Sequence, residues 1–476
     1  MSRTLRHYNL EPNTAKEVGS MFQMKSLRSS WKQISDTYPW HFVGFLVLAM
    51  LIPKIYDLTD TYWIGKISYS ALAITEQYEF IAVTIEIVNE TIPLGVLALV
   101  AQNYKNREKI ISILKAGILV QIIFSLLLTT IVVGFTPQFV STIGTPTEIV
   151  ALTTRYLILK SIALPFDSIA IIMLVTIKSM RKGREALYLA LSSVLLNVVL
   201  DLFLISNMNF SLKLGVEGVA IGYTVSKLTL AVLSSIFATR LLGIRKTRSN
   251  SENWRDKIKP LFSIGGWTGV DSLVRNIGYI LVPLSVLNFI GTGPFGGYGL
   301  AMTVMWTLII PVLAISEGTN VVVGNNFGEG KTTEIKKTLL TSLVLVLVFM
   351  TAISVVGLFY WNDLSSFFNM NPDIVMYSVE TFKWLIIPYC CFAVGMILRS
   401  VFLGTGKTYY ILAISCVQNF LLIFPYWALS KIGIVTADFS NTMGLFVIVF
   451  LVDPVVSYIF VRRILNRETQ KSHKDA

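Results

Sequence analysis

An amide and a carboxylate lie four residues apart in the apolar segment 186–206, at Asn197 and Asp201. On a helix, side chains at this spacing share one face, one turn apart. A carboxylate at membrane depth costs roughly 2.5–3.5 kcal/mol on insertion scales, so it is rarely without a role. One interpretation is a buried ion pair with a nearby Lys or Arg. The other is a coupling-ion site, in which Asp201 takes up H⁺ or Na⁺ and Asn197 completes the shell of ligands.

The apolar segment 40–65 carries a second candidate acid, Asp60. Lys54 and Asp57 are three residues apart and can pair on one helix face, which leaves Asp60 as the acid available for titration. The alternative is that Asp60 caps a helix end near Gly65, although side-chain caps favour helix starts. We therefore expect Asp60 to contribute to the same cation site as Asp201.

The segment 71–102 carries four glutamates on one quadrant of a helical wheel: Glu76, Glu79, Glu86 and Glu90. An acidic stripe on a membrane helix should line water or a binding cavity rather than lipid. Such a stripe suits cationic, lipophilic guests. The alternative is internal pairing with basic residues of nearby spans, namely Lys54, Lys115, Arg155 and Lys160.

Charges in two other spans have neighbours at helical spacing. Asp167 lies seven residues after Lys160, so both occupy one face, and we count Asp167 with Glu79, Glu86 and Glu90 as a substrate-binding candidate. Asp271 and Arg275 lie four residues apart, which predicts an internal ion pair.

The composition is that of a polytopic membrane protein. Of the 476 residues, 54% are hydrophobic and 14% charged, against about 25% charged in soluble domains. The mean hydropathy is +0.65, and the length allows roughly a dozen spans of ~20 residues. The three cysteines, Cys390, Cys391 and Cys416, lack metal-ligand spacing. We therefore expect no metal centre and no cofactor beyond the coupling ion.

Apolar runs predict twelve spans, and the joints between them set the orientation. The spans lie near 40–65, 71–102, 110–134, 149–179, 186–206, 216–240, 260–287, 299–323, 334–359, 374–402, 408–430 and 438–461. Every even-numbered joint and both tails hold two or more basic residues, whereas the odd joints hold only Lys66, Lys213 and Lys431. The positive-inside rule then places both termini in the cytoplasm. This alternation accounts for the net charge of +12 without a nucleic-acid partner.

The two halves of the chain repeat. Matching residues are Gly95 and Gly318, Asn103 and Asn326, Pro165 and Pro388, and Asn197 and Asn419, with offsets of 223, 223, 223 and 222. Six spans per half is an even number, so both halves enter the membrane in the same direction and should flank a cleft. The repeat position of Asp201 is Ile423, which places the ion site in the N-terminal half.

These patterns predict five regions along the chain. They are a cytosolic tail at 1–37, an N-terminal lobe at 38–243, a cytosolic linker at 244–259, a C-terminal lobe at 260–462 and a cytosolic tail at 463–476.

Several segments together resemble the multidrug and toxic compound extrusion (MATE) family of antiporters. They are DLTDTYWIGKISYSALA (57–73), SVLLNVVLD (193–201) followed by GVEGVAIGYTVSK (215–227), IGGWTGVDSLVRNIGY (264–279) and VVVGNNFGEGK (321–331). The resemblance implies twelve helices in two six-helix lobes around a V-shaped cleft. It assigns the cation site to Asp60, Asn197 and Asp201. A family threonine in helix six aligns with Tyr223, and the neighbouring Thr224 is taken as the fourth ligand.

The expected function is secondary active efflux of organic, cationic compounds in exchange for H⁺ or Na⁺. Neither an enzyme nor nucleotide binding is expected: no catalytic constellation is present, and GNNFGEGKT (324–332) misses the P-loop spacing by one residue. The partners are the substrates and the bilayer of the cell membrane, and a monomer suffices. A lipid-linked oligosaccharide flippase is the alternative, but it needs a cationic cavity for pyrophosphate. A non-transporting scaffold would need no acids confined to one half.

Overall fold

The computed structural model describes most of the chain. The described residues are 38–67, 71, 74–75, 77–142, 147–206, 208–243, 254–369 and 371–474. The predicted tail at 1–37 and most of the predicted linker at 244–259 lie outside them, as does Glu76. Within the described residues, every regular element is helical.

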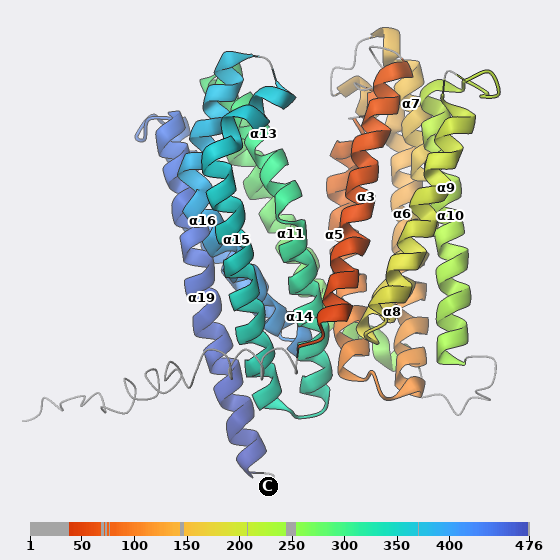
Figure 1. Cartoon of the computed structure of the whole chain (residues 1–476), viewed down its shortest axis with the longest axis vertical. Coiled ribbons are helices and arrows are strands. Elements are labelled where there is room, and N and C mark those ends of the chain that lie inside the picture. The colour runs from red at the N-terminus through yellow and green to blue at the C-terminus, as the bar shows by residue number, and fades with distance from the viewer. Residues whose placement is uncertain are drawn as a thin grey trace, which may run out of the picture. The chain divides into compact units, whose positions relative to one another are not determined.

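The described residues of the N-terminal half form seven helices, which lie on the right in Figure 1. They are α3 (Trp40–Ile67), α5 (Tyr78–Gln102), α6 (Arg107–Thr142), α7 (Thr147–Ser161), α8 (Leu164–Ser179), α9 (Gly183–Leu204) and α10 (Gly215–Leu242).

Among the described residues of the C-terminal half, the first element is the 3₁₀ turn η1 (Trp254–Lys257), and two segments, η2 and η3, are π-helical. Its other elements, in chain order, are α11 (Ile258–Tyr279), η2 (Ile280–Leu287), α12 (Asn288–Ile290), α13 (Thr292–Leu308), α14 (Ile310–Gly328), α15 (Thr332–Phe368), α16 (Pro372–Thr405), α17 (Tyr409–Gln418), η3 (Asn419–Ile423), α18 (Phe424–Lys431) and α19 (Phe439–Lys474).

The helices have the length and the apolar surface that a bilayer requires. Among the described residues, nine segments are long and apolar enough to cross a membrane, and the bent pair α13–α14 makes a tenth. Only helices and closed barrels satisfy their own backbone groups in lipid. Large apolar side chains stay on the outside, such as Phe135 and Phe359, which are 64% and 76% exposed. Within the described residues, each of the twelve predicted spans overlaps one helix or consecutive helices.

Two predicted spans are interrupted, and a proline explains each break. The fourth splits between α7 and α8 just before Pro165, and the eighth bends by 47° between α13 and α14 just before Pro311. Proline has no N–H to donate to the carbonyl four residues earlier, which favours a break at these two positions. Hydropathy alone did not predict these breaks.

The halves meet where α5 packs against α11 (Figure 1). Glycines permit the contact: a Cβ atom at Gly95 would lie 2.8 Å from the Leu261 carbonyl oxygen, and Cβ atoms at Gly265 and Gly269 would overlap Thr91. The Thr268 hydroxyl donates to the Glu90 carbonyl oxygen at 2.5 Å across the same contact. Small residues let two membrane helices approach closely, so α5 and α11 hold side chains of both halves in one place.

Candidate transport site

The predicted cation ligands Asn197 and Asp201 lie together on α9 and face α10. They are 7% and 2% exposed. Ser226 of α10 donates its hydroxyl to Asn197 Oδ1 at 2.7 Å. A Cβ atom at Gly222, one turn before Ser226, would lie 3.5 Å from Asp201 Oδ1. Glycine and serine on this face of α10 thus leave room for a buried amide and a buried carboxylate.

The other two predicted cation ligands are placed differently. The Thr224 hydroxyl donates to the Ala220 carbonyl oxygen at 2.8 Å and lies 3.3 Å from the Leu159 carbonyl oxygen of α7. Thr224 comes two residues after Gly222, so at ~100° per residue it lies on nearly the opposite face of α10. The structure therefore does not bring Thr224 to Asn197 and Asp201. The backbone of Asp60 belongs to α3, but its side chain lies outside the described residues.

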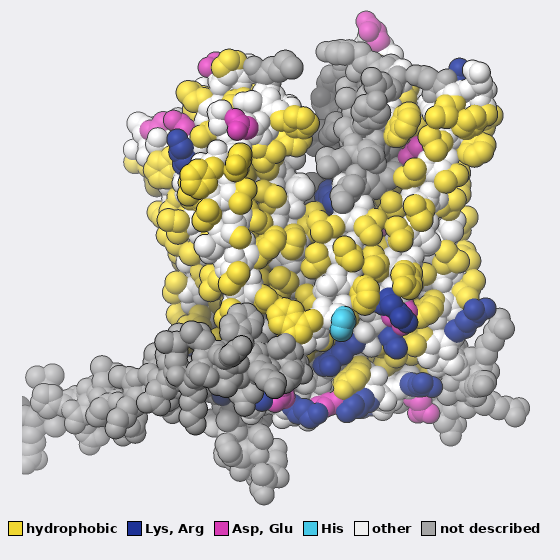
Figure 2. Space-filling view, in the orientation of Figure 1, with side chains coloured by type: hydrophobic (Ala, Val, Ile, Leu, Met, Phe, Trp, Pro, Cys, Tyr) yellow, Lys and Arg dark blue, Asp and Glu magenta, His cyan; other side chains and the backbone are white. Residues whose placement is uncertain are grey.

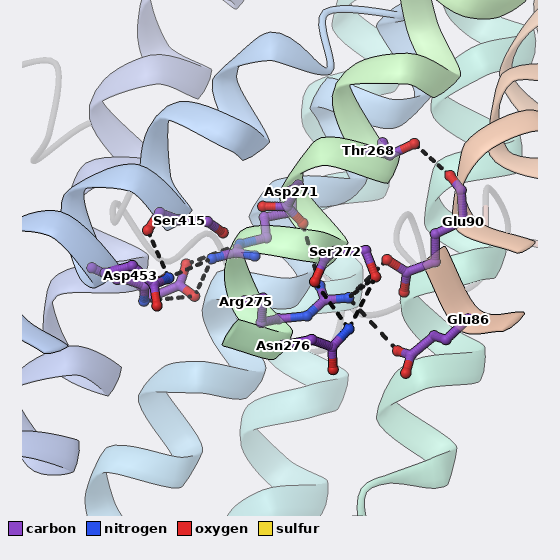
Figure 3. Close-up of polar contacts among 12 residues, drawn as sticks. Glu86, Glu90, Thr268, Asp271, Ser272, Arg275, Asn276, Ser415 and Asp453 are labelled. Carbon is purple, nitrogen blue, oxygen red and sulfur yellow. Dashed lines mark hydrogen bonds and ion pairs between the residues drawn. The ribbon is translucent and has the colours of Figure 1, made fainter. Parts of the chain in front are cut away.

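Two glutamates of the predicted acidic stripe face an arginine of the other half (Figure 3). Arg275 of α11 donates through Nη2 to Glu90 Oε2 at 2.7 Å, and the same nitrogen lies 3.7 Å from Glu86 Oε1. Its Nη1 lies 3.3 Å from Asp271 Oδ2. The predicted pair of Asp271 with Arg275 is confirmed. The side chain of Glu79 lies outside the described residues.

One guanidinium therefore faces three carboxylates between the halves. The side chains of Glu86 and Arg275 are 51% and 42% exposed, whereas Asp271 is 3% exposed. Asp271 Oδ1 has no hydrogen-bond partner among the described residues. With all four groups ionised the cluster is negative, so it favours positively charged ligands. The sequence interpretation proposed partners for the stripe only within the N-terminal half. It missed Arg275, which it had already paired with Asp271.

Asp167, the fourth substrate-binding candidate, is paired within its own half. Its Oδ1 accepts from Lys227 Nζ of α10 at 2.6 Å, and the two side chains are 14% and 25% exposed. Lys160, which the sequence placed on the same helical face as Asp167, contacts tyrosines instead. Its Nζ is 2.9 Å from the Tyr156 hydroxyl and 4.0 Å from the Tyr78 ring centroid. A cationic guest at Asp167 would have to compete with Lys227.

The C-terminal half contains a buried ion pair that the sequence interpretation missed. Arg399 of α16 donates to both carboxylate oxygens of Asp453 on α19, at 3.2 and 2.7 Å. Their side chains are 13% and 1% exposed. The Ser457 hydroxyl also donates to Asp453, at 3.1 Å. Arg399 lies within α16, six residues before its end.

A second set of contacts joins the halves at the end of the molecule where Lys and Arg side chains gather (Figure 2). Gln102 of α5 donates to the Gly404 carbonyl oxygen of α16 at 2.9 Å, and Asn325 of α14 donates to the Ala101 carbonyl oxygen at 2.8 Å. Gln102 and Asn325 differ by the repeat offset of 223. Repeat-related amides thus reach across in both directions, which closes the halves against each other at this end.

Charged groups strengthen the closed end. Lys178 of α8 forms an ion pair with Glu317 of α14 at 2.9 Å. Glu329, just after α14, accepts from the Tyr104 hydroxyl and lies 2.5 Å from both Lys105 and Lys331. Bonds to Lys105, Lys331 and Tyr104 lower the pKa of Glu329 to about 2. Tyr104 and Lys105 belong to the other half, so this carboxylate joins the two halves.

We expect Glu329→Gln to lower thermal stability in detergent at pH 5–7 by a small amount, because exposed ion pairs contribute little. A carboxylate whose pKa falls from 4.5 to about 2 on folding stabilises the folded state above pH 4.5, and the effect fades as the pH falls toward 2. The difference in Tm between wild type and variant should therefore shrink from pH 5 to pH 3. A difference that grows on acidification would contradict this assignment.

Comparisons with known proteins agree with this geometry. A helical bundle with charged side chains between two halves that repeat in sequence is an arrangement common in membrane transporters. The MatE family model matches residues 46–203 and 268–428, and the chain belongs to this family. Twelve transmembrane helices in two lobes, the fold predicted from the sequence, is confirmed by this match and by the solved structures that follow.

Curated relatives and solved structures share low identity with the chain but cover most of it. The chain is 22% identical over 389 residues to the multidrug export protein MepA of Staphylococcus haemolyticus. The aligned region covers 77% of this chain and 81% of MepA. MepA of Staphylococcus aureus strain MSSA476 is 21% identical over 386 residues, with the same coverage.

Two solved structures each superpose with a TM-score of 0.80 at 16% identity, covering 90% of this chain and 95% of the other. One is the outward-facing conformation of a multidrug resistance MATE family transporter. The other is a MOP superfamily transporter from Pyrococcus furiosus, in which reverse polarity of the binding pocket suggests a different function. At this level of identity both support the fold alone.

Proposed function

We propose that this protein exports organic cations from the cell in exchange for H⁺ or Na⁺. The observation that carries the proposal is the cluster between α5 and α11, where Arg275 faces Glu86, Glu90 and Asp271. Its excess of negative charge and the exposed Glu86 suit a cationic guest in the cleft between the lobes. The MepA relatives, described as multidrug export proteins, support export as the function.

The coupling ion binds in the N-terminal half, at Asp201 and Asn197 with Asp60 as the expected third ligand. In the C-terminal half, both buried carboxylates on described residues, Asp271 and Asp453, already pair with an arginine. Neutralising Asp201 by H⁺ or Na⁺ removes the cost of burying its charge, so α9 and α10 can repack and favour release of the guest.

The orientation follows from the basic residues. The end closed by Gln102, Asn325 and Glu329 carries the Lys- and Arg-rich joints, so the positive-inside rule makes it the cytoplasmic end. The site between the halves then opens to the outside. The chain acts in the cell membrane with both termini in the cytoplasm. A monomer suffices, because both halves of the site lie on one chain.

The flippase alternative is disfavoured by the sign of the charge. A pyrophosphate-linked substrate needs a cationic cavity, and the site between α5 and α11 has more carboxylates than guanidinium groups. Two lysines inside the N-terminal half, Lys160 and Lys227, already contact Tyr156 and Asp167.

The test is ethidium efflux from proteoliposomes under an imposed pH gradient and then an imposed Na⁺ gradient. We expect one gradient to drive efflux in the wild type and Asp201→Asn to lose at least about tenfold of the rate, because the amide cannot change charge. Asp363→Asn, which removes an exposed acid of α15, is the matched control and should transport normally. Normal gradient-driven efflux by Asp201→Asn would refute the assignment of the ion site, and wild-type failure under both gradients would refute the transport proposal.

A further inference from the structure

A cavity of about 650 Å³ opens between the C-terminal end of α15 and the first turns of α16. Its polar lining consists of Asn362, Ser366, Asn369, Glu380 and Lys383. A second cavity of about 420 Å³ lies beside it and shares Lys383. The rest of its lining is apolar: Trp384, Ile387, Pro388, Val447 and Leu451. A polar pocket therefore leads into an apolar groove along one face of α16.

The polar pocket holds one acid and one base, Glu380 and Lys383. Among the described residues, Glu380 and Lys383 form no ion pair with each other or with any other side chain. Both are exposed. A ligand that carries one positive and one negative charge can complement both residues at once, and the amides of Asn362 and Asn369 can donate to its oxygens.

The length of α16 indicates where the two cavities lie relative to the bilayer. The 34 residues of α16 span ~51 Å at 1.5 Å per residue, about 20 Å more than the hydrocarbon core. If the excess is shared between the two ends, the core begins near residue 379. Glu380 and Lys383 then lie at the headgroup boundary, where Trp384, 42% exposed, is a typical interfacial residue.

The apolar groove continues from this boundary into the core. Ile387 and Leu451 on its walls are 70% and 41% exposed. Pro388 lies inside α16 and cannot donate to the Trp384 carbonyl, so the helix is weakest where the groove runs. A fatty acyl chain fits the apolar lining, whereas a free headgroup would leave the groove empty.

We propose that this surface of α15, α16 and α19 binds a phospholipid whose headgroup carries an ammonium and a phosphate. The ammonium pairs with Glu380, the phosphate with Lys383, and one acyl chain lies along Ile387 and Leu451. The site is separate from the transport site between α5 and α11, so its failure leaves the proposed function intact.

The test is native mass spectrometry of the delipidated full-length protein titrated with phosphatidylethanolamine, phosphatidylcholine, phosphatidylglycerol or the chain-free headgroup glycerophosphoethanolamine. We expect the wild type to bind phosphatidylethanolamine about fivefold to tenfold more tightly than phosphatidylglycerol, whose headgroup has no ammonium for Glu380. Glu380→Gln should remove this preference, and Lys383→Gln should weaken both lipids. Val447→Trp should weaken every lipid by filling the groove.

Two controls separate the site from general effects. Asp363→Asn removes an exposed acid of α15 that does not line the pocket, and it should leave lipid binding unchanged. Circular dichroism and gel filtration check that each variant is folded. Equal binding of phosphatidylethanolamine by wild type, Glu380→Gln and Lys383→Gln would overturn the proposal. The proposal would also fail if the wild type bound phosphatidylglycerol more tightly than phosphatidylethanolamine, or bound glycerophosphoethanolamine as tightly as phosphatidylethanolamine.

Discussion

Asp453→Asn is expected to destabilise the protein by about 3–5 kcal/mol, the usual effect of removing one partner from a buried ion pair. The variant leaves the Arg399 guanidinium, only 13% exposed, without the carboxylate that accepts its two shorter hydrogen bonds. Gln418 Oε1, at 3.4 Å, is a weak neutral substitute. The loss falls on the contact between α16 and α19, which holds the C-terminal half together.

The size of the effect follows from burial and from the lack of space for water. A Cβ atom at Gly395 would lie 2.7 Å from Asp453 Oδ1, so the carboxylate packs directly against the backbone of α16. A charge in this position cannot recover its hydration when the partner is removed. Arg399→Met combined with Asp453→Leu should be much more stable than Asp453→Asn, because the double variant buries no charge.

Thermal unfolding in detergent, followed by tryptophan fluorescence, measures the difference. Glu334→Gln is the control, since it breaks the surface pair with Lys337, whose side chains are 31% and 57% exposed. An exposed pair contributes at most about 1 kcal/mol. If Asp453→Asn lowered Tm no more than Glu334→Gln, the Arg399–Asp453 pair would not have the structural importance assigned to it.

The sequence predicted the helices well because lipid imposes a local rule. Every backbone group must be satisfied within its own helix, so runs of apolar residues mark the spans. Repeat offsets between pairs such as Gly95 and Gly318 then gave the two halves. The breaks before Pro165 and Pro311 were not predicted. Pro388, by contrast, lies within the unbroken helix α16. Proline alone therefore does not decide between a break and a continuous helix.

The side-chain pairs were predicted only where they are local. Asp271 and Arg275 are one turn apart, and their pair was predicted correctly. Arg275 also reaches Glu90, 185 residues away, and Arg399 reaches Asp453, 54 residues away. No helical periodicity links residues at these separations. They are brought together by helix packing, which in the first case depends on the glycines of α5 and α11.

Glu86→Gln and Glu90→Gln make the same chemical change one turn apart on α5. We expect the first to act mainly on substrate binding and the second mainly on stability. Glu90 holds Arg275 at 2.7 Å with a side chain 29% exposed, whereas Glu86 lies 3.7 Å from Arg275 and is 51% exposed. Glu86 is thus the carboxylate that an organic cation reaches first. Glu90 is a positioning residue that keeps Arg275 of one half attached to the other.

Glu86→Gln should weaken ethidium binding to the purified protein about tenfold, or roughly 1.4 kcal/mol, with little change in Tm. Glu90→Gln should lower Tm, because the ion pair between the halves loses its shortest contact. It should weaken binding less, since Arg275 then moves toward Glu86 and Asp271 and competes with the guest there. Fluorescence titration gives the affinity and thermal unfolding gives the stability for the same samples.

Arg275→Gln separates competition from simple loss of structure. It removes the tethered cation and leaves Glu86, Glu90 and Asp271 without a guanidinium, so like charges raise the free energy of the empty protein and a guest cation relieves that repulsion. We therefore expect lower stability together with tighter ethidium binding, and a rise in Tm on adding ethidium that exceeds the wild-type rise. Weaker ethidium binding in Arg275→Gln, or equal effects of Glu86→Gln and Glu90→Gln on both measurements, would show that the cluster is structural and that the guest binds elsewhere.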